Sequence, residues 1–178
     1  DEAIYYLERS VDISKYNTIS LLNLADAFRN STVIEDKISK ERSVLEYVLS
    51  FDPVNVKALS LLVRSLSKNK RGKDVNAVYQ RLKDSLEYFK GRSNFGPYHL
   101  TVGFTAVSVG DYKYAQYVYQ DGVNRFPTAK NYVELATVEF NFLQNLDKGI
   151  ALYKKALELN PNVVKNQAIK ALIKQYES

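Results

Sequence analysis

Gly149-Ile150-Ala151-Leu152-Tyr153-Lys154-Lys155-Ala156-Leu157-Glu158-Leu159-Asn160-Pro161-Asn162 is the stretch from which the fold can be inferred. It is typical of a helix that is closed by a turn, because the residue before a proline is pushed out of the α region. The segment 97–127 matches the sequence 34 residues further along. In that alignment Tyr119 falls on Tyr153, Gly122 on Ala156 and Pro127 on Pro161.

A period of 34 residues in which bulky positions meet bulky ones and small positions meet small ones resembles the tetratricopeptide repeat. Two antiparallel helices cross closely only where side chains are small, and Gly103, Ala115, Gly122 and Ala156 supply such points. The resemblance implies an all-α, right-handed α–α superhelix of about four helical hairpins with a C-terminal capping helix. The sequence departs from the family in having no tryptophan, in a long turn at 30–36 and in Thr137 at a usually small position.

The repeat boundaries follow from this alignment, and we interpret residues 1–178 as a single solenoid domain. We expect it to be the C-terminal part of a longer protein, since it starts with a helix typical of the second half of a repeat. That helix has Ala3 and Leu7 before Ser10, and Val164–Tyr176 is expected to cap the other end through Val164, Ala168, Ala171 and Leu172. The expected units are residues 1–17 (a half repeat), 18–55, 56–95, 96–129, 130–163 and 164–178 (the cap).

The composition argues against an enzyme. The chain has no cysteine and a single histidine, His99, which we interpret as a half-buried packing residue of its repeat. A lone imidazole does not build the usual zinc site. A Ser-His catalytic pair would depend on this one histidine, and a Cys-His pair cannot form without cysteine. Glu134 and Glu139 are interpreted as helix-face carboxylates, and no glycine-rich phosphate loop occurs. We therefore predict no catalytic residues, no metal and no cofactor.

The charge pattern limits which classes of partner are expected. The formal net charge is +5, which suits acidic partners but lacks the dense basic patch that makes nucleic acid the first expectation. The densest basic run is Lys68-Asn69-Lys70-Arg71-Gly72-Lys73, interpreted either as a solvated loop or as a contact for phosphate or an acidic surface. No apolar run approaches the length of about 20 residues that a membrane span needs.

In the family that the sequence resembles, the first helix of each hairpin lines a concave groove. The resemblance therefore implies a partner-binding set made up of Leu22, Asp26, Arg29, Lys57, Ser60, Arg64, Leu100, Phe104, Val107, Glu134, Val138 and Asn141. The set from the second repeat is basic and the set from the third is apolar. Such a groove suits a protein or peptide that carries acidic residues and one or two apolar anchors.

Three other interpretations concern partners and location. One tetratricopeptide subfamily clamps chaperone tails with Lys and Asn, but Leu22 and Asp26 stand at those positions, so that ligand is not expected. Tyr132, Leu135 and Glu139 leave open an RNA-processing repeat of the half-tetratricopeptide type. A soluble tail of a bacterial envelope or glycan-assembly protein is also open, and the absence of cysteine slightly favours a periplasmic over a cytoplasmic location.

Overall fold

The computed structural model describes residues 2–68, 72–89 and 98–175. Within these residues the chain forms ten α-helices and one π-helical segment, and no strand. They belong to two compact units, residues 1–95 and 96–178, and the boundary falls between the repeats expected at 56–95 and 96–129. The all-α architecture of helical hairpins expected from the sequence is confirmed.

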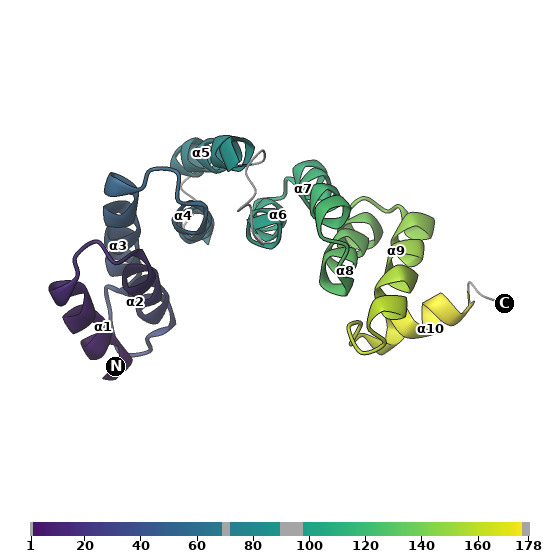
Figure 1. The fold of residues 1–178 in the computed structure, drawn as a ribbon, viewed down its shortest axis with the longest axis horizontal. Coiled ribbons are helices and arrows are strands. Elements are labelled where there is room, and N and C mark those ends of the chain that lie inside the picture. Colours follow the sequence, from purple (N-terminus) through teal and green to yellow (C-terminus); the bar gives the residue numbers. More distant parts are fainter. Residues whose placement is uncertain (1, 69–71, 90–97, 176–178) are drawn as a thin grey trace. The chain divides into compact units, whose positions relative to one another are not determined.

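The first unit contains a leading helix and two hairpins. Its helices are α1 (Glu2–Ile13), α2 (Thr18–Asn30), α3 (Lys37–Phe51), α4 (Val56–Lys68) and α5 (Gly72–Phe89). Helix α2 pairs with α3 and α4 with α5, while α1 packs on α2 and α3 on α4 (Figure 1). Helix α1 buries Ile4 against Leu24 and Phe28, and it continues past the end expected near Ser10.

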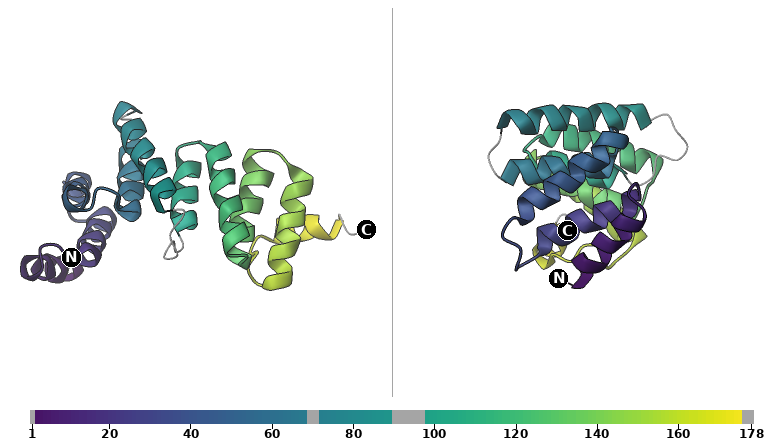
Figure 2. Two further views of the ribbon diagram at one scale, coloured as in Figure 1. Left: turned by 45° about the horizontal axis from the view of Figure 1, so that its top comes forward. Right: turned by 90° about the vertical axis from the view of Figure 1, so that its left-hand side faces the viewer.

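The second unit repeats this plan. Its helices are α6 (Tyr98–Ser108), α7 (Tyr112–Arg125), α8 (Ala129–Thr137), the π-helix η1 (Val138–Phe142), α9 (Leu146–Leu159) and α10 (Gln167–Gln175). Helix α6 pairs with α7, and α8 with α9, and these hairpins can be followed in Figure 2. Side chains of short polar residues start several helices, for example Asp111, which accepts a hydrogen bond from the Tyr114 amide at 3.2 Å.

Prolines end the second helices as the sequence predicts. Pro53, Pro127 and Pro161 each lie two residues beyond the last residue of α3, α7 and α9. The residues before them have left the helical region, with φ and ψ of −130° and 75° at Asp52 and of −154° and 103° at Asn160. The steric restriction on the residue before a proline therefore sets the length of these helices.

Close helix crossings occur at the small residues identified in the sequence. A Cβ placed on Gly103 would lie 2.5 Å from two ring carbons of Tyr119, and one on Gly149 would lie 2.7 Å from Phe140 Cβ. Ala115 and Ala156 are fully buried. Tyr119 and Tyr153, the matched large residues, are both 2% exposed. The small residues thus leave the space that the aromatic rings occupy.

Two expectations about the capping helix need correction. The capping helix begins at Gln167 and not at Val164, because the Asn166 side chain accepts a hydrogen bond from the Ala168 amide at 2.9 Å and starts the helix there. This shifts the apolar stripe, so that Ile173 is buried and Ala168 and Ala171 are exposed. Tyr176 and the central part of the basic run, residues 69–71, lie outside the described residues.

His99 is more than a half-buried packing residue. Its side chain is 2% exposed, its Nε2 lies 2.9 Å from Asp121 Oδ2, and its ring meets Phe126 edge-on. The sequence pattern placed it correctly at a large-residue position. It gave no sign of the carboxylate partner, because Asp121 lies 22 positions away on α7.

Glu139 is fully buried and not a residue of an exposed helix face. It lies in η1, where its carboxylate accepts hydrogen bonds from Gln116 and Asn145, both at 2.7 Å, and contacts Lys148 Nζ at 2.5 Å. Burial by itself raises the pKa of Glu139, but the bonds from Asn145, Gln116 and Lys148 outweigh it and hold that pKa below its usual value. The carboxylate therefore stays ionised and joins η1 to α7 and α9.

We predict that Gly103→Ala destabilises the chain, since the added methyl group overlaps the buried Tyr119 ring. The expected loss is about 1–3 kcal/mol of unfolding free energy, typical of an overpacked core, and it exceeds the roughly 0.5–1 kcal/mol that alanine gains in a helix. Urea unfolding of the purified chain measures it. In a Tyr119→Leu background the ring is absent and the penalty is expected to vanish. A Gly103→Ala protein as stable as the parent would contradict the packing described here.

Candidate functional site

A pocket opens in the first unit where α2 ends, α3 begins and the last turns of α4 pass by. Its volume is about 190 Å³. We call it the basic pocket, and its lining residues are Arg29, Lys37, Ile38, Glu41, Arg64, Ser65 and Lys68. Among these described residues four side chains are basic and one is a carboxylate, so the pocket carries an excess of positive charge.

The long connection between α2 and α3 precedes Lys37 of the basic pocket and is held by hydrogen bonds of Ser31. Ser31 is buried, and its Oγ accepts hydrogen bonds from the amides of Val33 and Ile34, both at 3.3 Å. The Ser31 carbonyl accepts a hydrogen bond from Lys37 Nζ at 2.7 Å. These bonds fix the first residue of α3 beside the end of α2.

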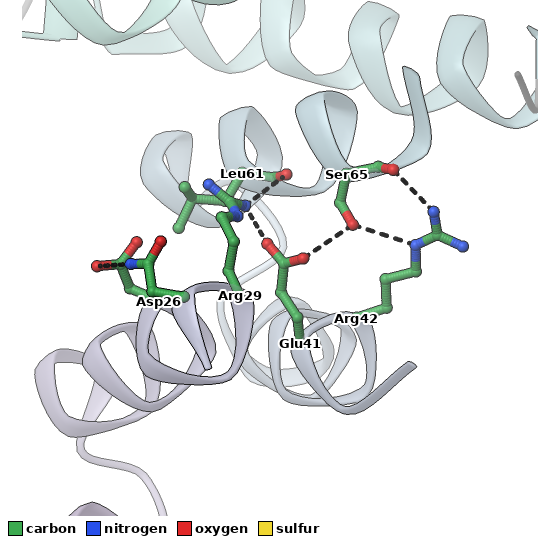
Figure 3. Close-up of polar contacts among 7 residues, drawn as sticks. Asp26, Arg29, Glu41, Arg42, Leu61 and Ser65 are labelled. Atoms are coloured by element: carbon green, nitrogen blue, oxygen red, sulfur yellow. Dashed lines mark hydrogen bonds and ion pairs between the residues drawn. The ribbon is translucent and has the colours of Figure 1, made fainter. Parts of the chain in front are cut away.

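A buried carboxylate joins the three helices of the basic pocket (Figure 3). Glu41 on α3 is 2% exposed and pairs with the Arg29 guanidinium of α2. Its second oxygen accepts a hydrogen bond from Ser65 Oγ of α4 at 3.0 Å. A buried charge is tolerated only when it is paired and hydrogen-bonded, which is the case for Glu41.

Arg42 extends this network on the other side of Ser65. Its Nε donates to Ser65 Oγ at 3.2 Å, and its Nη2 donates to the Ser65 carbonyl at 2.8 Å (Figure 3). Arg29 also donates to the carbonyl of Leu61 at 3.4 Å. The walls of the pocket are therefore held by side-chain bonds between helices as well as by apolar packing.

The pKa of Arg64 reflects the concentration of positive charge in the basic pocket. Burial and then the nearby Arg29 charge lower this pKa, while Glu41 and Asp26 act in the opposite direction. The guanidinium remains charged, since arginine titrates far above neutral pH. Arg29 and Arg64 thus place two guanidinium groups on one cavity.

The expected partner-binding residues of the first unit have different surroundings. Arg29 and Arg64 line the same pocket, and Lys57 is exposed nearer the start of α4 than Arg64. Asp26 is exposed and accepts a hydrogen bond from Asn30 at 3.3 Å. Leu22 and Ser60 are 6% and 1% exposed, because they face neighbouring helices, so they offer little surface to a partner.

The expected residues of the second unit include an apolar surface on α6. Phe104 is 50% exposed, and Leu100 and Val107 are partly buried beside it in the helical sequence. Asn141 is exposed on η1, whereas Val138 is completely buried. We call Leu100, Phe104 and Val107 the apolar surface.

Glu134, the remaining expected residue, lies on α8 and is partly buried. Burial raises its pKa, and the nearby Lys130 lowers it by less, so the pKa of Glu134 lies above its usual value. Because Glu134 is already partly buried, covering its carboxyl group with an apolar partner costs less solvation free energy than covering a fully solvated carboxyl group would.

Sequence reasoning missed several residues of the basic pocket. Lys37, Ile38 and Glu41 lie on α3, a second helix, whereas the family rule considers first helices only. Lys68 belongs to the basic run noted in the sequence, and its position on the last turn of α4 explains why it reaches the pocket. Lys37 and Glu41 are four positions apart and therefore lie on one face of α3. This spacing was the sequence signal that could have indicated a charged site on a second helix.

The described residues contain neither a cluster suited to a metal ion nor a helix suited to a membrane. In residues 2–68, 72–89 and 98–175, no group of three or more His, Asp or Glu side chains is arranged to hold a metal ion. Over the same ranges, none of the helices combines the length and the apolar character that crossing a membrane requires.

Several solved structures have a fold similar to that of this chain. TTC0263, a thermophilic TPR protein from Thermus thermophilus, matches with a TM-score of 0.65 over 97% of this chain and 87% of that chain, at 16% identity. A crystal structure of MamA matches with a TM-score of 0.58 over 92% of this chain and 90% of that one, at 16% identity. MamA 41-end from Desulfovibrio magneticus RS-1 matches with a TM-score of 0.54 over 79% of this chain and 74% of that chain, at 19% identity.

These similarities confirm the tetratricopeptide-type solenoid fold that the repeat pattern predicts. At such identities they establish the fold alone. No protein-family model matches the sequence, and no curated protein matches it significantly.

We predict that the Arg29–Glu41 pair is coupled in stability. Glu41→Leu leaves the Arg29 charge without its buried partner and is expected to cost about 3 kcal/mol of unfolding free energy. The double variant Arg29→Met/Glu41→Leu is expected to lose clearly less than the sum of the two single variants. As a control, Arg125→Met removes an arginine whose side chain is 36% exposed and which pairs with Asp121, and should cost under about 1 kcal/mol. Strictly additive losses would show that the pair contributes no coupling.

Proposed function

We propose that the chain is a non-catalytic scaffold that binds a peptide or a partner protein on the first helices of its hairpins and at the basic pocket, which the start of α3 completes. The observation that carries this proposal is the basic pocket, which combines a cavity, four cations among its described lining residues and walls fixed by interhelical bonds. The fold supports the same function, because stacked helical hairpins create extended surfaces that repeat proteins use for binding.

The first unit suits acidic residues of the partner. Lys57 is exposed on α4, and Arg64 follows it on the same helix at the pocket. Two cations separated by seven positions lie about two helical turns apart on one face, since a turn takes 3.6 residues. An extended or helical peptide with acidic residues about 10 Å apart matches that spacing, given a rise of roughly 1.5 Å per residue.

The second unit suits an apolar anchor of the partner. Half of the Phe104 side chain is exposed on α6, and Leu100 and Val107 flank it at helical spacing. Aromatic side chains, phenylalanine among them, are enriched at protein interfaces relative to the rest of the surface. We therefore propose the apolar surface as a second contact for the partner.

Binding of RNA is the less favoured function. Glu139, one residue of the motif that suggested it, is buried and bonded to Gln116, Asn145 and Lys148. These bonds give Glu139 a structural role within the second unit, so its presence does not require RNA binding. The experiment on partner binding includes nuclease treatment, which separates the two functions.

We predict that Lys57→Glu/Arg64→Glu/Phe104→Ala abolishes capture of the partner in a pull-down from an extract of the source cells. Charge reversal repels acidic residues, and the alanine removes the exposed ring. The matched control is Lys113→Glu/Lys155→Glu/Leu159→Ala, which makes the same charge change and removes an exposed apolar side chain on second helices.

The proposal requires that the parent and the control capture the same protein, with or without nuclease, and that the triple variant does not. Circular dichroism checks that all three chains are equally folded. Equal capture by the triple variant would contradict the placement of the binding surface. Capture that nuclease abolishes would favour RNA binding.

A further inference from the structure

We infer that the basic pocket receives a phosphorylated side chain of the partner protein. This inference rests on the proposed function and specifies the chemistry that the first unit recognises. The charges of the lining residues, the local structure at the start of α3 and the size of the cavity each support it.

The charges favour a dianion over a carboxylate. Arg29, Lys37, Arg64 and Lys68 line the pocket, and Glu41 is the carboxylate among its described lining residues. Since Glu41 is already bonded to Arg29 and to Ser65, the described lining as a whole keeps a clear excess of positive charge. A phosphomonoester brings a charge of about −1.5 to −2 and three acceptor oxygens, whereas a carboxylate brings −1 and two.

The N-terminal end of α3 borders the basic pocket through Lys37 and Ile38. Its first turn, Lys37-Ile38-Ser39-Lys40, contains two cations, while Glu35 and Asp36 directly precede it and offset part of their charge. The N-cap residue, Asp36, makes no side-chain hydrogen bond to the helix. The N-terminus of a helix carries a partial positive charge, which disfavours lysine there and favours a bound anion.

Two guanidinium groups, those of Arg29 and Arg64, line the same cavity, and this arrangement also favours a bound anion. Burial, followed by the charge of Arg29, lowers the pKa of Arg64. Like charges that are held close together in a cavity are typical of functional sites. A bound phosphoryl group suits this arrangement, because both guanidinium groups can donate to its oxygens.

The size of the cavity matches a single side chain. About 190 Å³ is below the range of roughly 300–1,000 Å³ typical of cofactor and drug-sized ligands. It is several times the roughly 30 Å³ that one water occupies in the liquid, which leaves room for a phosphoryl group and the carbon that bears it. The walls are also held in place, since Glu41 and Ser65 join α3 to α4.

The first test is the pull-down with an extract that has been treated with phosphatase. Capture of the partner by the intact chain is expected to fall at least tenfold after this treatment, and to persist in an extract with phosphatase inhibitors. Undiminished capture would overturn the inference while leaving the scaffold function standing. Absence of capture in either extract would instead count against the scaffold function.

The second test measures the pocket directly, by NMR on the whole chain labelled with ¹⁵N. The probes are N-acetyl-O-phosphoserine amide and N-acetyl-glutamate amide. We expect the phosphorylated probe to shift the Nε–H signals of Arg29 and Arg64 and to bind at least tenfold more tightly than the glutamate probe. Equal affinities for the two probes would overturn the inference in favour of a carboxylate pocket.

The variant Arg64→Gln tests the assignment to this pocket. Removing one guanidinium is expected to weaken binding of the phosphorylated probe at least tenfold, with a spectrum that otherwise remains that of the folded chain. The control Lys155→Gln makes the same charge change at an exposed position of α9 in the other unit and is expected to bind like the parent. Equal affinities of the two variants would show non-specific attraction to a basic protein and would overturn the inference.

Discussion

Close approach of paired helices at small residues is the constraint on which the rest of the structure depends. A helical hairpin has too little apolar surface to bury by itself, so each one must pack tightly against its neighbours. At Gly103 and Gly149 there is no room even for a methyl group beside Tyr119 and Phe140. This spacing fixes where neighbouring helices run and therefore which side chains reach the candidate binding surfaces.

A buried glutamate joins three helical segments in each unit. Glu41 of α3 holds Arg29 of α2 and Ser65 of α4, and Glu139 of η1 holds Gln116 of α7 and Lys148 of α9. The two differ in their surroundings. The network of Glu41 borders a cavity with an excess of cations, while the bonds to Glu139 account for the buried carboxylate within its own unit. This difference is why we place charge recognition in the first unit.

The sequence predicts the fold well because the features that determine it are local or periodic. Small residues, large residues and prolines recur with a period of 34 residues, and each acts through packing or through the backbone of its own turn. The basic pocket could be predicted only in part. Arg29 and Arg64 follow from the helix phase, but Glu41 and Ser65 meet across 24 positions, and no periodicity relates them. Ser60 and Val138 are buried by neighbouring helices. The periodicity of one helix does not show where its neighbours pack, so their burial could not be predicted.

The most direct test of the account is a crystal structure of the chain with the partner segment that it captures. We expect the captured segment to contact α4, with its phosphorylated side chain among Arg29, Lys37 and Arg64. A segment bound to the second helices α5, α7 or α9, with the basic pocket empty, would contradict it.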